Sequence, residues 1–170
     1  MQMDLKLFKH NKKAYKAAVC LMEEVGKAAI IHPTGTGKSM IAFQLAVDNP
    51  HKRIVWFSPS EYIFRTQLDN ITKILSGQNY EIKNIIFLTY AKLMHNEAII
   101  EVLCPDYIIL DEFHRCGAVE WGKSITKLLN VYPNVKLLGL SATNIRYLDN
   151  PEPESGQWSF SKPRCHYRSL

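Results

Sequence analysis

Five short apolar segments, separated by helical patterns, constrain the fold of this chain more than any other feature. The segments are continuously hydrophobic, as in Tyr107-Ile108-Ile109-Leu110, and strands of that kind belong in a parallel sheet covered on both faces. The expected strands are Lys27–His32, Arg53–Ser58, Asn84–Thr89, Asp106–Leu110 and Val135–Leu140. The expected helices span about residues 11–25, 38–48, 60–75, 91–103 and 120–131. With right-handed crossovers, this order predicts an open, doubly wound, mainly parallel α/β sheet.

The repeat predicts one domain over residues 1–150. Residues 151–170 begin with the linker-like Pro151-Glu152-Pro153-Glu154 and show no periodic apolar pattern, so we expect an irregular tail that is disordered or truncated. The apolar runs are only a few residues long, whereas a membrane helix needs about 20. With no apolar core of signal-peptide length, the sequence predicts no membrane segment and a cytoplasmic location.

Cysteine and charge patterns exclude some classes of site. The four cysteines are far apart and form no C-x-x-C pair, which argues against a zinc site or a redox motif. The net charge is +5, and residues 1–20 carry five lysines against Asp4, or 5 − 1 = +4 of it. The simpler interpretation of these lysines is one solvated helix face, so the charge is weak evidence for nucleic acid.

A glycine-rich loop, Gly35-Thr36-Gly37-Lys38-Ser39, stands between a predicted strand and a predicted helix. Glycines let consecutive N–H groups turn toward phosphate oxygens, and the following helix adds its positive N-terminus. Lys38 is expected to reach the β- and γ-phosphates, and the Ser39 hydroxyl to bind Mg²⁺. The predicted cradle includes Pro33 and Thr34, with His32 where the full pattern has glycine. The alternative is a glycine turn that only caps a helix.

Two adjacent carboxylates, Asp111 and Glu112, end a predicted buried strand. We expect Asp111 to hold the Mg²⁺ of an ATP–Mg²⁺ complex. Glu112 is expected to orient the attacking water and accept its proton. Taken alone, the pair could also be a polar strand end.

Together these motifs resemble the superfamily 2 helicases of the DEAD/DEAH-box type. Asp111-Glu112-Phe113-His114 resembles their motif II, the glycine-rich loop is similar to motif I, and Ser141-Ala142-Thr143 to motif III. Thr89-Tyr90 resembles a segment of the branch that holds the type III restriction enzymes and UvrB-like proteins. The resemblance covers about residues 5–148 and implies the N-terminal RecA-like, ATP-binding lobe.

The resemblance also implies roles for further residues. His114 is expected in the catalytic set, and Ser141, Ala142 and Thr143 are expected to couple nucleotide state to nucleic-acid binding. Asn11, which with Ala14 resembles the adenine-reading segment, is expected to pair with adenine, while Phe8 stands where an arginine is common. The residues expected to meet a nucleic-acid backbone are Ser58, Pro59, Gln67, Thr89 and Tyr90. The structural alternatives are a strand stop at Ser58-Pro59, a solvated His114 and a helix cap at Ser141–Thr143.

The implied function is the first lobe of a helicase or translocase, with DNA favoured over RNA. In such helicases a second RecA-like lobe supplies the arginines that speed phosphoryl transfer. The sequence ends before a second lobe, so we expect this chain to hydrolyse ATP slowly unless another chain supplies that lobe. A second interpretation is a stand-alone nucleotide-binding module that regulates a partner chain. A small-molecule kinase is weaker, because the residues after position 38 hold no lid-like cluster of basic side chains.

Overall fold

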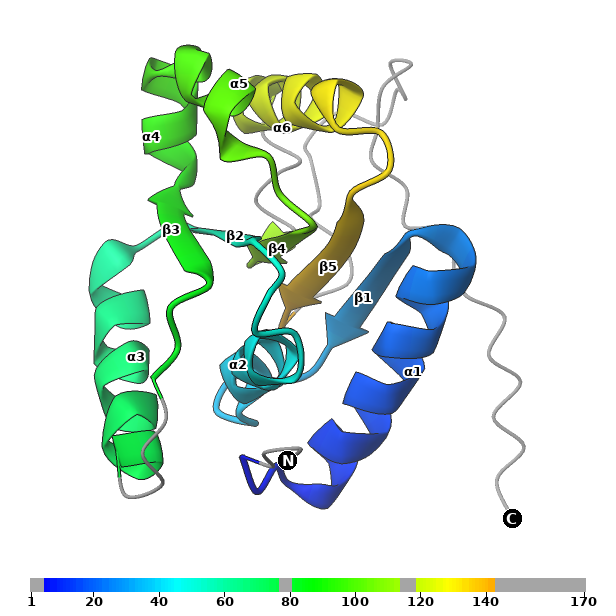
Figure 1. The fold of residues 1–170 in the computed structure, drawn as a ribbon, viewed down its shortest axis with the longest axis vertical. Helices are drawn as coiled ribbons and strands as arrows, with labels where there is room; N and C mark the ends of the chain where they lie inside the picture. The colour runs from blue at the N-terminus through cyan, green and yellow to red at the C-terminus, as the bar shows by residue number, and fades with distance from the viewer. Residues whose placement is uncertain (1–4, 77–80, 114–118, 143–170) are drawn as a thin grey trace.

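The computed structural model describes residues 5–76, 81–113 and 119–142. Within them, five parallel strands form one sheet in the order β1-β5-β4-β2-β3 (Figure 1). The strands are β1 (Lys27–Ile31), β2 (Ile54–Ser58), β3 (Ile85–Thr89), β4 (Tyr107–Asp111) and β5 (Lys136–Ser141). The predicted α/β class with a parallel sheet is confirmed, and each strand lies within one residue of its expected bounds.

The helices also follow the predicted order. They are α1 (Lys9–Val25), α2 (Lys38–Asp48), α3 (Glu61–Ser76), α4 (Tyr90–His95), α5 (Ile100–Leu103) and α6 (Val119–Val131). The helical residues expected over about 91–103 are present, but they are divided between α4 and α5. Asn96 leaves helical geometry, with φ −142° and ψ 70°, and a 3₁₀ turn at Glu97–Ile99 separates α4 from α5. None of the helices in the described ranges has the length and apolar character to cross a membrane. The expected tail, 151–170, lies outside these ranges.

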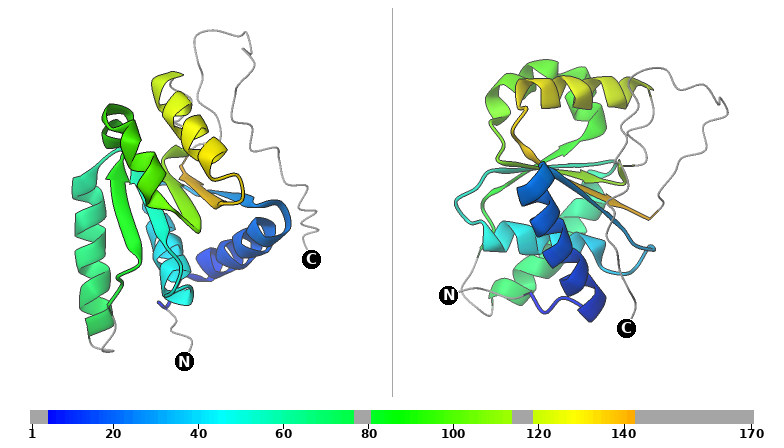
Figure 2. Two further views of the ribbon diagram at one scale, coloured as in Figure 1. Left: turned by 45° about the horizontal axis from the view of Figure 1, so that its top comes forward. Right: turned by 90° about the vertical axis from the view of Figure 1, so that its right-hand side faces the viewer.

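The sheet is the middle layer of three. Helices α1, α2 and α3 cover one face, and α4, α5 and α6 cover the other (Figure 2). Alternate residues of β2 supply the two cores: Ile54 and Trp56 pack toward α1–α3, whereas Val55 and Phe57 pack toward α4–α6. This two-sided burial explains why the strands are continuously apolar.

All five strands point the same way, so their carboxyl ends lie along one edge of the sheet. The glycine-rich loop follows β1. The last residue of each other strand is polar: Ser58 in β2, Thr89 in β3, Asp111 in β4 and Ser141 in β5. In open α/β sheets this edge is where ligands bind.

An aromatic cluster joins α2 and α3 to the sheet. The ring of Phe64 on α3 stacks on Phe87 of β3, with centroids 3.9 Å apart and planes 10° apart. Phe64 also meets Trp56 edge-on at 5.2 Å and lies 6.1 Å from Phe43 of α2. Such contacts add to the free energy gained by burying the rings. Phe64 is therefore the residue that anchors α3.

We expect Phe64→Ala to lower the free energy of unfolding by about 3–5 kcal/mol, because it removes a buried ring and leaves a cavity. Tyr62→Ala is the matched control, since Tyr62 lies on the same helix and is 79% exposed; its effect should stay within about 0.5 kcal/mol. Urea unfolding followed by circular dichroism measures both. Equal losses in the two variants would contradict this account of the cluster.

Candidate functional site

The position of β5 between β1 and β4 places the glycine-rich loop and the acidic pair two strands apart. Ile31 of β1 pairs with Ser141 of β5, and Asp111 of β4 pairs with Leu140. The backbone N–H of His32, the next residue after β1, donates to the Ser141 carbonyl at 3.0 Å. Because neighbouring strands lie about 4.8 Å apart, the ends of β1 and β4 are separated by roughly 10 Å.

The loop has the backbone that its glycines suggested. Gly35 and Gly37 have φ values of +81° and +78°, a left-handed region that costs little only for glycine. A Cβ added to Gly37 would come within 3.2 Å of the Asn11 side chain. Pro33 accepts hydrogen bonds from the Thr36 N–H at 3.4 Å and the Thr36 hydroxyl at 2.7 Å. The loop is therefore a tight turn, with Pro33 and Thr34 exposed on it.

Lys38, the first residue of α2, lies underneath this turn. Its side chain is buried, and its Nζ donates to the carbonyl oxygens of His32 at 2.8 Å and Pro33 at 3.1 Å. Ser39 follows in the first turn of α2 and is half-buried. The ammonium group and the start of α2 thus concentrate positive charge beneath the loop.

Asn11 does not have the environment expected of an adenine-reading residue. It is fully buried, and its Nδ2 donates to the carbonyls of Thr36 at 2.7 Å and Gly37 at 3.2 Å. Its Oδ1 lies 3.2 Å from Nδ1 of His32. Both ends of the amide are used inside the protein, so in this structure Asn11 holds the loop and has no edge to offer a base.

Two histidines complete the surroundings of the loop. Nε2 of His10 lies 3.2 Å from the Thr36 carbonyl, and its ring centroid lies 5.5 Å from that of His32. Burial lowers the pKa of the His32 imidazole below its usual value, and the neighbouring His10 and Lys38 lower it further. His32 stands where the full loop pattern has glycine. These effects favour its neutral imidazole, which can still form the hydrogen bond to Asn11.

Ser58 and Tyr90, which are predicted to contact nucleic acid, both form hydrogen bonds to Asp111. Both are buried. The Ser58 hydroxyl donates to Oδ2 of Asp111 at 3.1 Å, and the Tyr90 hydroxyl donates to the Asp111 backbone carbonyl at 2.8 Å. Ser58 thus supplies a donor to the Asp111 carboxylate, and Tyr90 supplies one to the backbone carbonyl of the same residue. Both residues position Asp111.

The Asp111 carboxyl is the most perturbed acid of this edge. Burial raises its pKa to about 6, and the charge of Glu112 raises it as well, while hydrogen bonds from Ser58 and the Glu112 N–H and the charge of Lys38 lower it. The charge of Lys38 therefore acts on Asp111 in the direction opposite to burial. Glu112 has a φ of +52°, which costs a non-glycine residue on the order of 1 kcal/mol. Strain of this kind is typical of functional positions.

The other predicted residues are more scattered. Pro59 and Gln67 are half-buried, after β2 and on α3. The Thr89 hydroxyl caps α4 by accepting from the Lys92 N–H at 3.1 Å. Ser141 is buried and Ala142 half-buried at the end of β5. His114 and Thr143 lie outside the described residues.

Comparison with known protein families agrees with this geometry. The model of the family described as type III restriction enzyme, res subunit, matches residues 4–146. The chain belongs to this family. Its members carry an N-terminal domain of superfamily 2 helicases, so at the family level the chain is an ATP-binding, helicase-type lobe. No individual curated protein matches the chain.

The donor set at this edge of the helicase-type lobe fits a magnesium ion. Mg²⁺ prefers oxygen ligands and is usually held by one or two carboxylates together with substrate phosphates. The Asp111 carboxylate lies two strands away from the loop that leads to the Ser39 hydroxyl. Asp111 and Ser39 are the residues that would hold the ion, and its charge would favour the ionised carboxylate.

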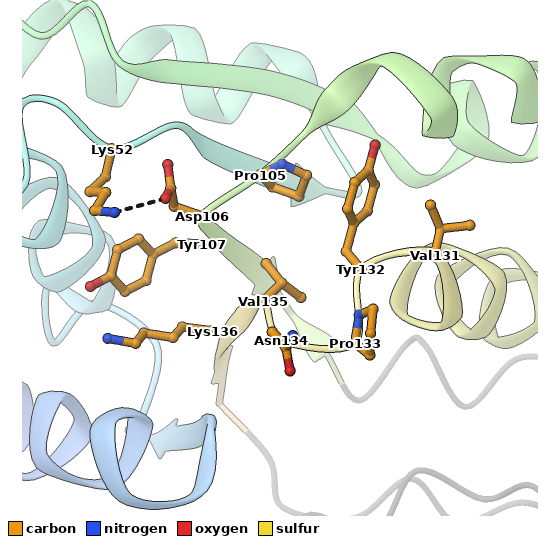
Figure 3. Close-up of a pocket in the computed structure, with 10 residues that line it drawn as sticks. All are labelled: Lys52, Pro105, Asp106, Tyr107, Val131, Tyr132, Pro133, Asn134, Val135 and Lys136. Atoms are coloured by element: carbon orange, nitrogen blue, oxygen red, sulfur yellow. Dashed lines mark hydrogen bonds and ion pairs between the residues drawn. The ribbon is translucent and has the colours of Figure 1, made fainter.

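A cavity of about 410 Å³ lies at the opposite edge of the lobe (Figure 3). It is lined by residues that begin β4 and β5, including Asp106, Tyr107 and Lys136. Lys52, which also lines it, forms an ion pair with Asp106 at 3.0 Å, and Lys136 pairs with Glu23. With both lysines paired and the motifs at the other ends of the strands, this cavity is separate from the candidate site.

We expect the difference in stability between Asp111→Asn and the wild type to depend on pH. The carboxyl titrates near 3.9 in an unfolded chain and at about 6 in the folded one. The folded state therefore binds more protons between these values, and the free energy of unfolding falls as the pH rises through them. Asparagine removes the buried charge, so the variant should exceed the wild type by about 1–3 kcal/mol at pH 8 and match it near pH 4.

Urea unfolding at several pH values, with a chelator present, measures this difference. Asp106→Asn is the control of opposite sign. The hydrogen bond from the Arg53 N–H, together with Lys52, holds the pKa of Asp106 below its usual value, so that variant should be less stable than the wild type at pH 8. A pH-independent effect of Asp111→Asn would contradict the burial of a charge at this position.

Proposed function

We propose that this lobe binds ATP–Mg²⁺ at the carboxyl edge of its sheet and serves a nucleic-acid-dependent helicase or translocase, with DNA favoured over RNA. The observation that carries the proposal is geometric: the glycine turn above Lys38 follows β1, and Asp111 ends β4, so the two lie at the same edge of the sheet with only β5 between their strands. A cation beneath a tight glycine turn and a carboxylate two strands away suit a triphosphate and its magnesium ion.

The loop residues have the chemistry to hold the triphosphate. Lys38 now bonds the carbonyl oxygens of His32 and Pro33, and phosphate oxygens would replace those acceptors with charged ones, which make stronger hydrogen bonds. The N–H groups of Thr34–Lys38 and the N-terminus of α2 would supply the remaining donors. The cofactor residues proposed are thus Asn11 and Pro33 through Ser39, and Asn11 also holds the loop through its bonds to Thr36 and Gly37.

The two acidic residues would have different roles, one toward the metal ion and the other toward the attacking water. Asp111, with Ser39, would hold the magnesium ion, which neutralises charge on the phosphates when bound. Glu112 would orient the attacking water and accept its proton, with His114 in the same catalytic set. A second RecA-like lobe, in this protein or in a partner, would add the arginine that stabilises the transferring phosphoryl group.

We expect Lys38→Ala to weaken the binding of ATP–Mg²⁺ by roughly 10- to 150-fold, because it removes a charge-assisted hydrogen bond to phosphate. Isothermal titration calorimetry measures the affinity. Lys52→Ala is the control: this lysine is ion-paired at the opposite edge, and its loss should leave the affinity unchanged. If Lys38→Ala binds ATP as tightly as the wild type, the loop is not a phosphate site.

The arrangement of side chains at the ends of β2 and β3 supports the proposal that this lobe binds nucleic acid there. At each end one residue turns inward to Asp111 and its neighbour lies nearer the surface: Ser58 beside Pro59, and Tyr90 beside Thr89. A nucleic-acid backbone bound at Pro59, Thr89 and Gln67 would therefore adjoin side chains that hold the metal-binding carboxylate. Ser141, which ends β5 between β1 and β4, would take part in the same coupling together with Ala142 and Thr143.

We expect ATP–Mg²⁺ to change the affinity of the chain for an oligodeoxythymidylate by several-fold, a size typical of coupled sites. Fluorescence anisotropy of the labelled oligonucleotide measures the affinity at fixed salt, because backbone contacts are salt-dependent. Lys38→Ala should abolish the change while leaving nucleotide-free binding intact. The same affinity with and without ATP–Mg²⁺ would contradict coupling through Ser58 and Tyr90.

A further inference from the structure

A groove of about 640 Å³ runs between helices α1 and α2, which lie next to each other on one face of the sheet (Figure 1). The α1 residues that line it recur at helical spacing: Lys12, Tyr15, Lys16, Val19, Met22 and Glu23. At 1.5 Å per residue this wall is about 16 Å long, or roughly three helical turns. The groove is therefore long enough to receive side chains from about three turns of a partner helix.

The deepest lining residues of the groove are apolar. Met22 of α1 and Leu45 of α2 are each 1% exposed, and Leu7 is also buried. Val19 is half-buried and lies nearer the surface. Apolar side chains of a partner would gain free energy by displacing water from these residues.

The two acidic residues of the groove are engaged within the protein. Asp48 accepts hydrogen bonds from the Tyr15 hydroxyl at 2.5 Å and from Nε2 of Gln44 at 2.9 Å. Burial and the contact with Asp48 raise the pKa of Tyr15, so its hydroxyl remains a donor at neutral pH. Glu23 pairs with Lys136 of β5. The charge that an incoming group meets is therefore set mainly by lysines.

Four exposed lysines form a positive stripe on the first half of α1. Lys9, Lys12, Lys13 and Lys16 are three or four residues apart, and the helix carries no acidic residue before Glu23. Lys12 and Lys16 line the groove, whereas Lys9 and Lys13 lie outside it. A partner that enters the groove would bring its own charges close to Lys12 and Lys16, and carboxylates would complement them.

We propose that the α1–α2 groove docks an acidic, amphipathic helix of a partner protein. The apolar side chains of that helix would enter between Val19 and Leu45, and its carboxylates would face Lys12 and Lys16. Nucleic acid suits the groove less well, because a phosphate backbone has no apolar side chains to fill it. Docking there does not require nucleotide binding at the glycine-rich loop.

Fluorescence anisotropy of a labelled peptide, measured with the full chain at near-physiological salt, tests the proposal. The probe is a capped helical peptide of about 14 residues, with leucines three and four residues apart on one face and glutamates beside them. A control peptide has lysines in place of the glutamates. We expect the acidic peptide to bind saturably, and at least about tenfold more tightly than the basic one.

Reversal of the lysines that line the groove, in Lys12→Glu/Lys16→Glu, should weaken binding of the acidic peptide by roughly 10- to 100-fold. The matched control is Lys9→Glu/Lys13→Glu, which reverses the same charges on the same helix outside the groove; its affinity should stay within about threefold of the wild type. Val19→Thr replaces a methyl group with a hydroxyl and should weaken binding several-fold, because it makes the groove less apolar. Thermal unfolding checks that each variant is folded.

The absence of saturable binding by the acidic peptide up to roughly 1 mM overturns the proposal. Equal losses in the two double variants also overturn it, because they would indicate attraction by charge alone. So does a labelled oligodeoxythymidylate that binds in place of the peptide and is weakened by Lys12→Glu/Lys16→Glu, since the stripe would then be a nucleic-acid surface. Lys38→Ala should bind the peptide like the wild type, so this proposal and the proposed function can fail separately.

Discussion

The insertion of β5 between β1 and β4 is the constraint on which the site depends. The glycine-rich loop and the acidic pair follow strands that are not neighbours. Their separation is set by the width of β5 and by the hydrogen bond from the His32 N–H to the Ser141 carbonyl. Two inter-strand spacings, about 10 Å, leave room for a phosphate chain and an ion. The same insertion makes Ser141 the residue that lies between the two halves of the site.

Two other strand ends are joined to Asp111 by hydrogen bonds. Ser58 and Tyr90 reach it from the ends of β2 and β3, and Lys38 influences it from beyond β5. A desolvated carboxylate with a raised pKa is unfavourable for the fold at neutral pH, and the hydrogen bonds from Ser58 and the Glu112 N–H offset only part of that cost. Charged side chains that lower the stability of the fold are common at sites where the charge binds a ligand.

The sequence was sufficient for the fold and for the edge on which the motifs lie, because parallel strands buried on both faces leave continuous apolar runs. It was not sufficient for the direction of individual polar side chains. The hydrogen bonds that Asn11 makes to the loop, and that Ser58 and Tyr90 make to Asp111, could not be predicted, because they depend on how the strand ends and α1 are brought together. The break at Asn96 carried no glycine or proline to signal it.

Helix α1 links the two edges of the sheet. Its first turns are bonded to the P-loop through Asn11, and near its other end Glu23 pairs with Lys136, which begins β5. At 1.5 Å per residue, its 17 residues form a rod about 25 Å long. The helix therefore forms one continuous connection between the glycine-rich loop and the amino-terminal end of β5.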